Sequence, residues 1–160
     1  MKKMIATTIL LTIFCNAYPQ DNEWVKKSPM PTPRHGMCSV IYEDMIWIIG
    51  GEDSDGNILN SVECYLPFED RWESNIPPLS HGRLNAAAVV YEDKIFVIGG
   101  RDKENRALRS VEYFSSETNT WKLAADMNIA REALTAVVLH NTMFAIGGFS
   151  IDATNLSDVE

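Results

Sequence analysis

The sequence predicts an all-β fold made of four-stranded units that repeat along the chain about every 49 residues. Four kinds of landmark recur at spacings of 48 or 49 residues: a tryptophan, an arginine, a glycine pair and a Val-Glu pair. Short apolar runs of strand length lie between the landmarks, and turn residues such as Glu43-Asp44 and Glu92-Asp93 separate the runs. The landmarks are Trp24, Trp72 and Trp121; Arg34, Arg83 and Arg131; Gly50-Gly51, Gly99-Gly100 and Gly147-Gly148; Val62-Glu63, Val111-Glu112 and Val159-Glu160.

Each unit contains signals for four strands in a fixed order. The first strand follows the arginine and is rich in small and β-branched residues, at 36–42, 85–91 and 134–140. The second is an unbroken apolar run into the glycine pair, which predicts burial on both faces of the sheet. The third strand carries the Val-Glu pair and the fourth carries the tryptophan.

Four strands at a period near 50 residues are typical of a β-propeller blade. Residue sizes agree with wedge-shaped packing of blades. The small residues 86–88, all alanine, suit the crowded axis, and Trp72 and Trp121 suit the wider gap at the outside.

Three features of the repeat resemble kelch repeats. They are the glycine pair after an apolar strand, the third-strand aromatic residue (Tyr65, Phe114) and a tryptophan seven residues later (Trp72, Trp121). The resemblance covers roughly residues 24 to 160 and implies antiparallel, kelch-type propeller blades. We expect repeats at 24–72, 73–121 and 122–160, with the last one truncated.

The chain is too short to close a propeller ring by itself. Propellers have about four to eight blades, and the resemblance implies six or seven, whereas about three repeats are present. We therefore expect an incomplete ring and a sequence that is part of a longer one. The alternative is self-association: an outer strand at Trp24 and a last unit without its fourth strand are complementary, so chains could associate head to tail.

The first 17 residues have the layout of a secretory signal peptide. Lys2 and Lys3 precede an apolar stretch, and cleavage is expected after Ala17. The stretch is much shorter than the roughly 20 residues that a membrane-spanning helix needs, so we expect no membrane span and a secreted protein, extracellular or periplasmic.

The charge of the chain limits its partners. The formal net charge is −8, and it becomes −10 once the two lysines of the signal leave. An acidic chain without clustered positive charge is a poor ligand for nucleic acid.

Two cysteines would remain after cleavage, Cys38 and Cys64. They lie in the first and third strands of one unit, with a strand between them. Two strand spacings are about 9–10 Å, which is beyond the reach of a disulfide. We expect two buried thiols.

Residues that recur in every unit are expected to hold the blades together. This structural set is Gly50, Gly51, Gly99, Gly100, Gly147, Gly148, Trp72, Trp121, Glu63 and Glu112. Glycine permits positive φ or a close backbone approach at the exit of the strand.

The loops are where we expect binding. Strand direction places the entry to each first strand and the exit from each second strand on one face, with loops 52–58, 101–107 and 149–155. A fixed frame with variable loops usually binds through those loops, so we expect a protein or carbohydrate partner there. The predicted partner-binding residues are Arg34, His35, His81, Arg83, Arg131, Asp53, Asp55, Arg101 and Arg106. The kelch resemblance implies arginine contact with acidic groups, while the recurrence of Arg34, Arg83 and Arg131 also fits a structural role.

Other chemistry is less well supported by the sequence. The glycine pair is no phosphate loop, because no helix follows it and it recurs twice. Residues 53–57 resemble part of a calcium loop but lack the later glutamate, and their oxygens do not recur in the other two loops. Proteins with kelch-like propellers include galactose-oxidase-like and sialic-acid-epimerase-like carbohydrate-active enzymes. The alternative function that the resemblance implies is therefore that of the N-terminal part of a secreted propeller enzyme. The three histidines have no metal-ligand spacing, so we predict a non-catalytic binding scaffold with no cofactor and no metal.

Overall fold

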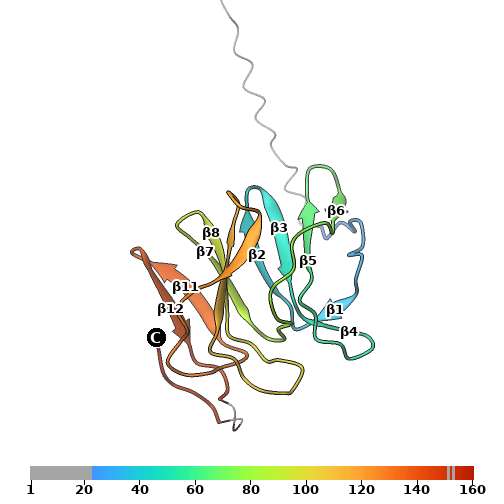
Figure 1. Cartoon of the computed structure of the whole chain (residues 1–160). Coiled ribbons are helices and arrows are strands. Elements are labelled where there is room, and N and C mark those ends of the chain that lie inside the picture. The colour runs from blue at the N-terminus through green and yellow to red at the C-terminus, as the bar shows by residue number, and fades with distance from the viewer. Residues whose placement is uncertain (1–22, 151, 153) are drawn as a thin grey trace, which may run out of the picture.

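The computed structural model of the chain describes residues 23–150, 152 and 154–160, and in that part it is all-β (Figure 1). The predicted signal peptide, residues 1–17, lies outside the described residues. Within them, no helix has the length and apolar character needed to cross a membrane. The predicted fold class is confirmed: antiparallel sheets follow one another along the chain.

The first two repeats each form a four-stranded antiparallel blade. Blade 1 (residues 34–73) contains β2 (Cys38–Tyr42), β3 (Met45–Ile49), β5 (Val62–Leu66) and β6 (Arg71–Glu73), paired in that order. Blade 2 (residues 83–123) repeats this order with β7 (Ala87–Tyr91), β8 (Lys94–Ile98), β9 (Val111–Ser115) and β10 (Thr120–Leu123). The four strands expected per unit are therefore present.

Blade 3 (residues 131–160) is partial. It contains β11 (Thr135–Leu139) paired with β12 (Thr142–Ile146), and a single bridge between Ile146 and Val159 stands where the third strand runs in the other blades. The structure thus describes two whole blades and most of a third.

A short strand pair joins the entry of blade 1 to the exit of its second strand. It consists of β1 (Arg34–His35) and β4 (Glu52–Asp53), which lie together at the lower right of the molecule in Figure 1. In the other blades, bridges from Leu84 to Arg101 and from Glu132 to Phe149 take its place. These pairings confirm that the entries to the blades and the three long loops share one face, which we call the loop face.

The hydrophobic core lies between consecutive blades. The innermost strands pack side by side, β2 against β7 and β7 against β11. Trp47 of blade 1 meets Phe114 of blade 2 with ring centroids 5.0 Å apart. The predicted burial of the second strand holds for β3 and β8, whereas the side chains of β12 are more exposed, because the described residues place no further blade against them.

The repeated tryptophans tie each outer strand to the segment before its blade. The Trp72 ring lies 5.1 Å from Tyr65, and its Nε1–H donates to the Ser28 carbonyl at 2.9 Å. Trp121 does the same with Phe114 and the Pro77 carbonyl. Trp24 differs: it is fully exposed and lies outside any strand. The predicted outer strand at Trp24 is wrong, since the described residues place no third-strand aromatic beside it.

The cysteine prediction is confirmed. Cys38 and Cys64 are buried and unpaired. Burial raises the pKa of each thiol to about 12, because the low-dielectric interior disfavours the thiolate.

Candidate functional site

A buried arginine stands at the entry of blade 2. Arg83, 1 % exposed, donates from Nη1 to the carbonyls of Gly99 and Ser110, both at 2.8 Å. Its Nη2 lies 2.9 Å from Oε1 of Glu112, which is equally buried. The second carboxylate oxygen, Oε2, accepts the backbone N–H of Ser80 at 2.8 Å. The arginine therefore joins three segments of the blade, and the glutamate balances its charge.

We call this arrangement, an arginine bonded to two backbone carbonyls and paired with a glutamate, the arginine clamp. The arginine clamp recurs in the other two blades. Arg34 pairs with Glu63 at 2.9 Å, and Arg131 pairs with Glu160. In blade 1 the Oε2 atom of Glu63 is buried without a hydrogen-bond partner. The cause is Pro31, which stands where blade 2 has Ser80 and has no N–H to donate.

These contacts favour the structural role that the sequence left open for the three arginines. Contact between a partner and Arg83 would require breaking bonds to two carbonyls and a buried carboxylate. The glycine pair supports the clamp: Gly99 has φ +62°, and a Cβ there would lie 2.5 Å from the Arg131 carbonyl of the next blade. The glycine is required by this close approach.

The loops that leave the second strands are closed by a repeated carboxylate. Asp53 Oδ1 accepts the backbone N–H groups of Asp55 and Asn57 at 3.0 and 2.9 Å. Bonds from Asn57 lower the pKa of Asp53. Asp102 accepts the N–H groups of Glu104 and Arg106 in the same way, at 3.0 and 2.9 Å.

The third loop uses a hydroxyl at the equivalent position. Ser150 Oγ accepts the Thr154 N–H at 3.3 Å. The expectation that the oxygens of 53–57 do not recur is thus wrong for Asp53, because Asp102 closes its loop through the same carboxylate oxygen and Ser150 closes the third loop through a hydroxyl oxygen. The spacing of 49 residues between the two aspartates carried this signal in the sequence.

The remaining predicted site residues point toward solvent or bind neighbours on the loop face. His35 and Asp55 are exposed. His81 is exposed and lies 2.9 Å from the Ser80 hydroxyl. Arg101 is half-buried and lies 3.5 Å from Glu132 of blade 3. Arg106 is mostly exposed and pairs with Asp102 at 2.7 Å.

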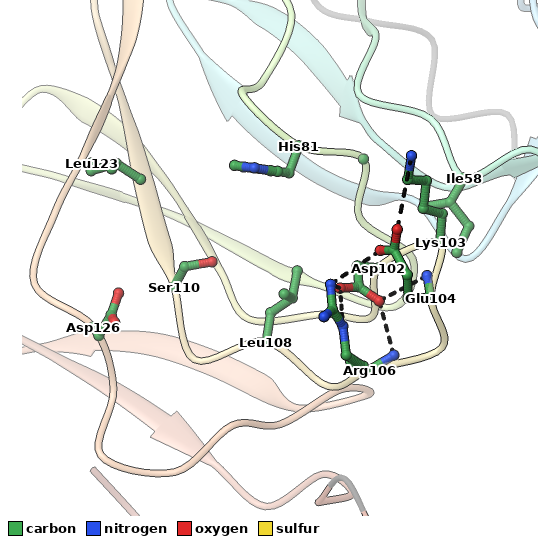
Figure 2. Close-up of a pocket in the computed structure, with 11 residues that line it drawn as sticks. Ile58, His81, Asp102, Lys103, Glu104, Arg106, Leu108, Ser110, Leu123 and Asp126 are labelled. Atoms are coloured by element: carbon green, nitrogen blue, oxygen red, sulfur yellow. Dashed lines mark hydrogen bonds and ion pairs between the residues drawn. The ribbon is translucent and has the colours of Figure 1, made fainter.

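A cavity of about 370 Å³ opens beside the loop of blade 2. Figure 2 shows the charged side chains of the loop on one side of the cavity and Leu123 and Asp126 on the other, with His81 between the two sides. Apolar side chains form much of its lining, with Ile58 from blade 1 and Leu108 and Leu123 from blade 2. Two of the predicted residues, His81 and Arg106, therefore lie at one cavity, and no pattern in the sequence predicted the apolar lining between them.

Comparisons with known proteins give one consistent result. The Kelch motif family matches residues 33–74 and 82–128. Alpha-scruin of Limulus polyphemus is 32 % identical over 139 residues, which is 81 % of this chain and 15 % of that protein. Kelch-like protein 40 of Xenopus laevis is 27 % identical over 80 % of this chain and 20 % of its own length.

A solved structure shares the architecture. The structure of YjhT aligns with a TM-score of 0.74 and 16 % identity, covering 83 % of this chain and 49 % of that one. The chain spans no more than about half of any of these three relatives.

Proposed function

The chain belongs to the kelch family, and from that premise we propose that it is a non-catalytic binding module whose partner is a protein that docks on the loop face. The proposal depends most on one observation. Loops 52–58 and 101–107 have the same internal bonds but present different side chains to solvent.

The two loops also share their backbone hydrogen bonds. Asp53 N–H donates to the Asn57 carbonyl at 3.1 Å, and Asp102 N–H donates to the Arg106 carbonyl at 3.0 Å. The third position after each aspartate has positive φ, +82° at Gly56 and +63° at Asn105. A scaffold that fixes the backbone leaves the outward side chains free to vary with the partner.

The outward side chains differ in charge. The four residues 54–57 (Ser-Asp-Gly-Asn) carry one negative charge, whereas residues 103–106 (Lys-Glu-Asn-Arg) carry a net positive charge. Charge differences of this kind set partner choice and association rate more than affinity. The cavity adjoining 103–106 adds an apolar floor with a polar rim, which is the composition of a protein-binding patch.

Site-specific crosslinking tests the location of the partner. A photo-crosslinking amino acid placed at Asp55 or Lys103 in the full-length protein should capture a discrete partner under native conditions. The control is the same group at Glu92, in the turn between β7 and β8 at the other end of the blade. Capture from Glu92 but from neither loop position would overturn the proposal, and capture of a glycan alone would favour the carbohydrate partner.

We keep export as part of the proposal, on the grounds of the charged and apolar pattern in residues 1–17. A protein processed after Ala17 begins at Tyr18. N-terminal sequencing of the protein from its source should find that residue first, and an intact Met1 would contradict export by this route.

A further inference from the structure

The cavity beside the loop of blade 2 lies at the outer side of the loop face. We call it the blade-2 cavity, and its lining includes Ile58, His81, Arg106, Leu108, Leu123 and Asp126. Among the residues that the structure describes, none from the inner strands β7 and β8 lines it, whereas Leu123 belongs to the outermost strand β10. The blade-2 cavity is therefore separate from the axis at which the innermost strands pack together.

The walls of the cavity come from a part of the chain with a blade on each side. The lining runs from Ile58 in blade 1 to Asp126 in the connection between blades 2 and 3. Blade 2 has all four of its strands, and its innermost strand packs against those of blades 1 and 3. The cavity is thus formed entirely by residues 58–126.

The wall residues do not recur, unlike the residues of the arginine clamp. At the repeat spacing of 49 residues, Ser74 of blade 1 corresponds to Leu123, and Pro77 corresponds to Asp126. Blade 1 therefore lacks both the apolar and the acidic side chain of this wall. Residues that vary on a fixed scaffold are those expected to recognise a partner.

The lining offers an apolar surface large enough for a side chain of a partner. The cavity volume of about 370 Å³ lies within the range of roughly 300–1,000 Å³ that is typical of ligand pockets. Ile58 and Leu108 are half-buried, and Leu123 is 68 % exposed. Covering this surface with an aliphatic or aromatic side chain would remove apolar area from water and stabilise the complex.

One hydroxyl in the lining can donate a hydrogen bond to a ligand. Ser110 Oγ accepts from Nη2 of the buried Arg83 at 3.0 Å. A serine hydroxyl has a single hydrogen, which this bond leaves available to donate. The Ser110 hydroxyl can therefore bind a peptide carbonyl beside an inserted side chain.

The charged groups of the cavity favour a cation as the second feature of the ligand. Three carboxylates line it, against two side chains with a full positive charge, Lys103 and Arg106. Arg106 already pairs with Asp102 at 2.7 Å and with Glu104 at 3.2 Å. The formal net charge of −8 adds attraction for a cation at longer range.

Asp126 is the carboxylate best placed to bind that cation. Figure 2 shows it on the other side of the cavity from the charged loop. Its Oδ2 lies 3.0 Å from Nε of Arg109, and its side chain is 42 % exposed. Among the described residues none donates to Oδ1, so this oxygen can accept a hydrogen bond from a ligand.

We propose that the blade-2 cavity binds a segment of the partner protein in which a large apolar side chain stands next to a lysine or arginine. The apolar side chain packs on Leu108 and Leu123, and the cation pairs with Asp126. This inference rests on the proposed function, because it names the chemistry of the partner on the loop face. It differs from the acidic group that the kelch resemblance implied, since the arginines expected to contact such a group are buried in the arginine clamps.

Titration of the full-length protein with blocked peptides tests this chemistry. The probes are glycine-serine peptides with a central Phe-Lys, Phe-Gln or Phe-Glu pair, and binding is read from the NMR shifts of the amides of loop 101–107. The Phe-Lys peptide should bind tightest. The Phe-Glu peptide should bind about tenfold more weakly, because attraction to a partly exposed carboxylate is replaced by repulsion.

Two variants test the residues, and each has a matched control. Asp126→Asn should reduce the preference for Phe-Lys over Phe-Glu to about twofold, whereas Glu117→Gln, at an exposed acid in the turn between β9 and β10, should leave it unchanged. Leu123→Ala should weaken binding of all three peptides. Ile41→Ala, at an exposed apolar residue of blade 1, should have no effect.

Several results would overturn the proposal. They are failure of all three peptides to bind, equal binding of the three, a preference for Phe-Glu, and a preference for Phe-Lys that survives in Asp126→Asn.

Crosslinking from Lys103 separates this proposal from the proposed function. If Asp126→Asn combined with Leu123→Ala leaves capture of the partner unchanged, the partner docks on the loop face without using the cavity, and only the present inference is wrong. If neither loop position captures a partner, the proposed function is wrong, while the peptide titration still decides whether the cavity binds an apolar group next to a cation.

Discussion

Replacing Arg83 by methionine should destabilise the protein more than any surface change. The substitution keeps much of the aliphatic volume but removes the guanidinium that bonds Gly99, Ser110 and Glu112. Glu112 is 1 % exposed and would keep only the Ser80 N–H. Leaving one partner of a buried ion pair without the other costs about 3–5 kcal/mol.

Chemical and thermal unfolding measure this cost. For a chain of this size, about 3–5 kcal/mol corresponds to a fall in Tm of roughly 6–20 °C. Arg71→Met is the matched control, because Arg71 also pairs with glutamates but its side chain is 48 % exposed. Surface pairs contribute about 1 kcal/mol or less.

A double-mutant cycle tests the cause. Arg83→Met combined with Glu112→Leu should be more stable than Arg83→Met alone, since no unpaired charge then stays buried. If Arg83→Met costs no more than Arg71→Met, or if the second substitution adds its full cost to the first, the clamp does not stabilise the blade as we argue.

Three further predictions address the scaffold and one loop. Cys38 and Cys64 should not react with a thiol reagent at pH 8 in the folded exported chain and should react on denaturation; fast reaction in the native state would contradict their burial. Gly99→Ala should lower the free energy of unfolding by several kcal/mol, because position 99 has positive φ and a Cβ there would clash with backbone. Gly56→Ala should lower it by about 1–2 kcal/mol, because position 56 has positive φ but open space around it. Equal losses in the two variants would refute the close-packing argument. Burial raises the pKa of Asp102, but hydrogen bonds from its own loop outweigh this and hold the pKa below its usual range. Because its pKa is lower in the folded state, ionised Asp102 stabilises the protein at pH values above its unfolded pKa near 3.8. This stabilisation is lost as the pH falls through the folded pKa. The urea midpoint of wild type should therefore exceed that of Asp102→Asn at pH 7 and approach it below about pH 4; a constant gap would contradict the sign.

Most of the blade could be predicted from the sequence, because the repeat sets strand order and strand order sets topology. The apolar run before Gly99 and the tryptophan at 121 each hold one position in every blade, so a period of 48 or 49 residues is enough to place them. Trp24 shows the limit of this reasoning. A landmark residue forms its element only when the neighbouring strand is there to pair with it.

The role of the arginines could be only half predicted. Their recurrence in every blade indicated a structural role, whereas the kelch resemblance implied contact with a partner. The burial of the side chains distinguishes these two roles, and burial cannot be predicted from residue spacing. The role of Asp102 was not predicted for another reason. Its carboxylate accepts hydrogen bonds from the backbone of its own loop, so the aspartate is part of the scaffold although the side chains around it vary between loops. The cavity between Ile58 and Leu108 depends on two blades meeting and had no local signal.

The two loops also allow an exchange that leaves the composition of the protein unchanged. Residues 54–57 and 103–106 can be swapped with each other while Asp53 and Asp102 stay in place. Positive φ is then required of asparagine at position 56 and of glycine at position 105, and both residue types accept it.

Retention of the crosslinked partner by the loop-exchanged protein is the most direct test of the division between scaffold and recognition. The account predicts a Tm within about 3 °C of wild type and partner retention at least tenfold lower. Unchanged partner retention in a protein that folds normally would contradict it, because the loop face would then be dispensable for binding.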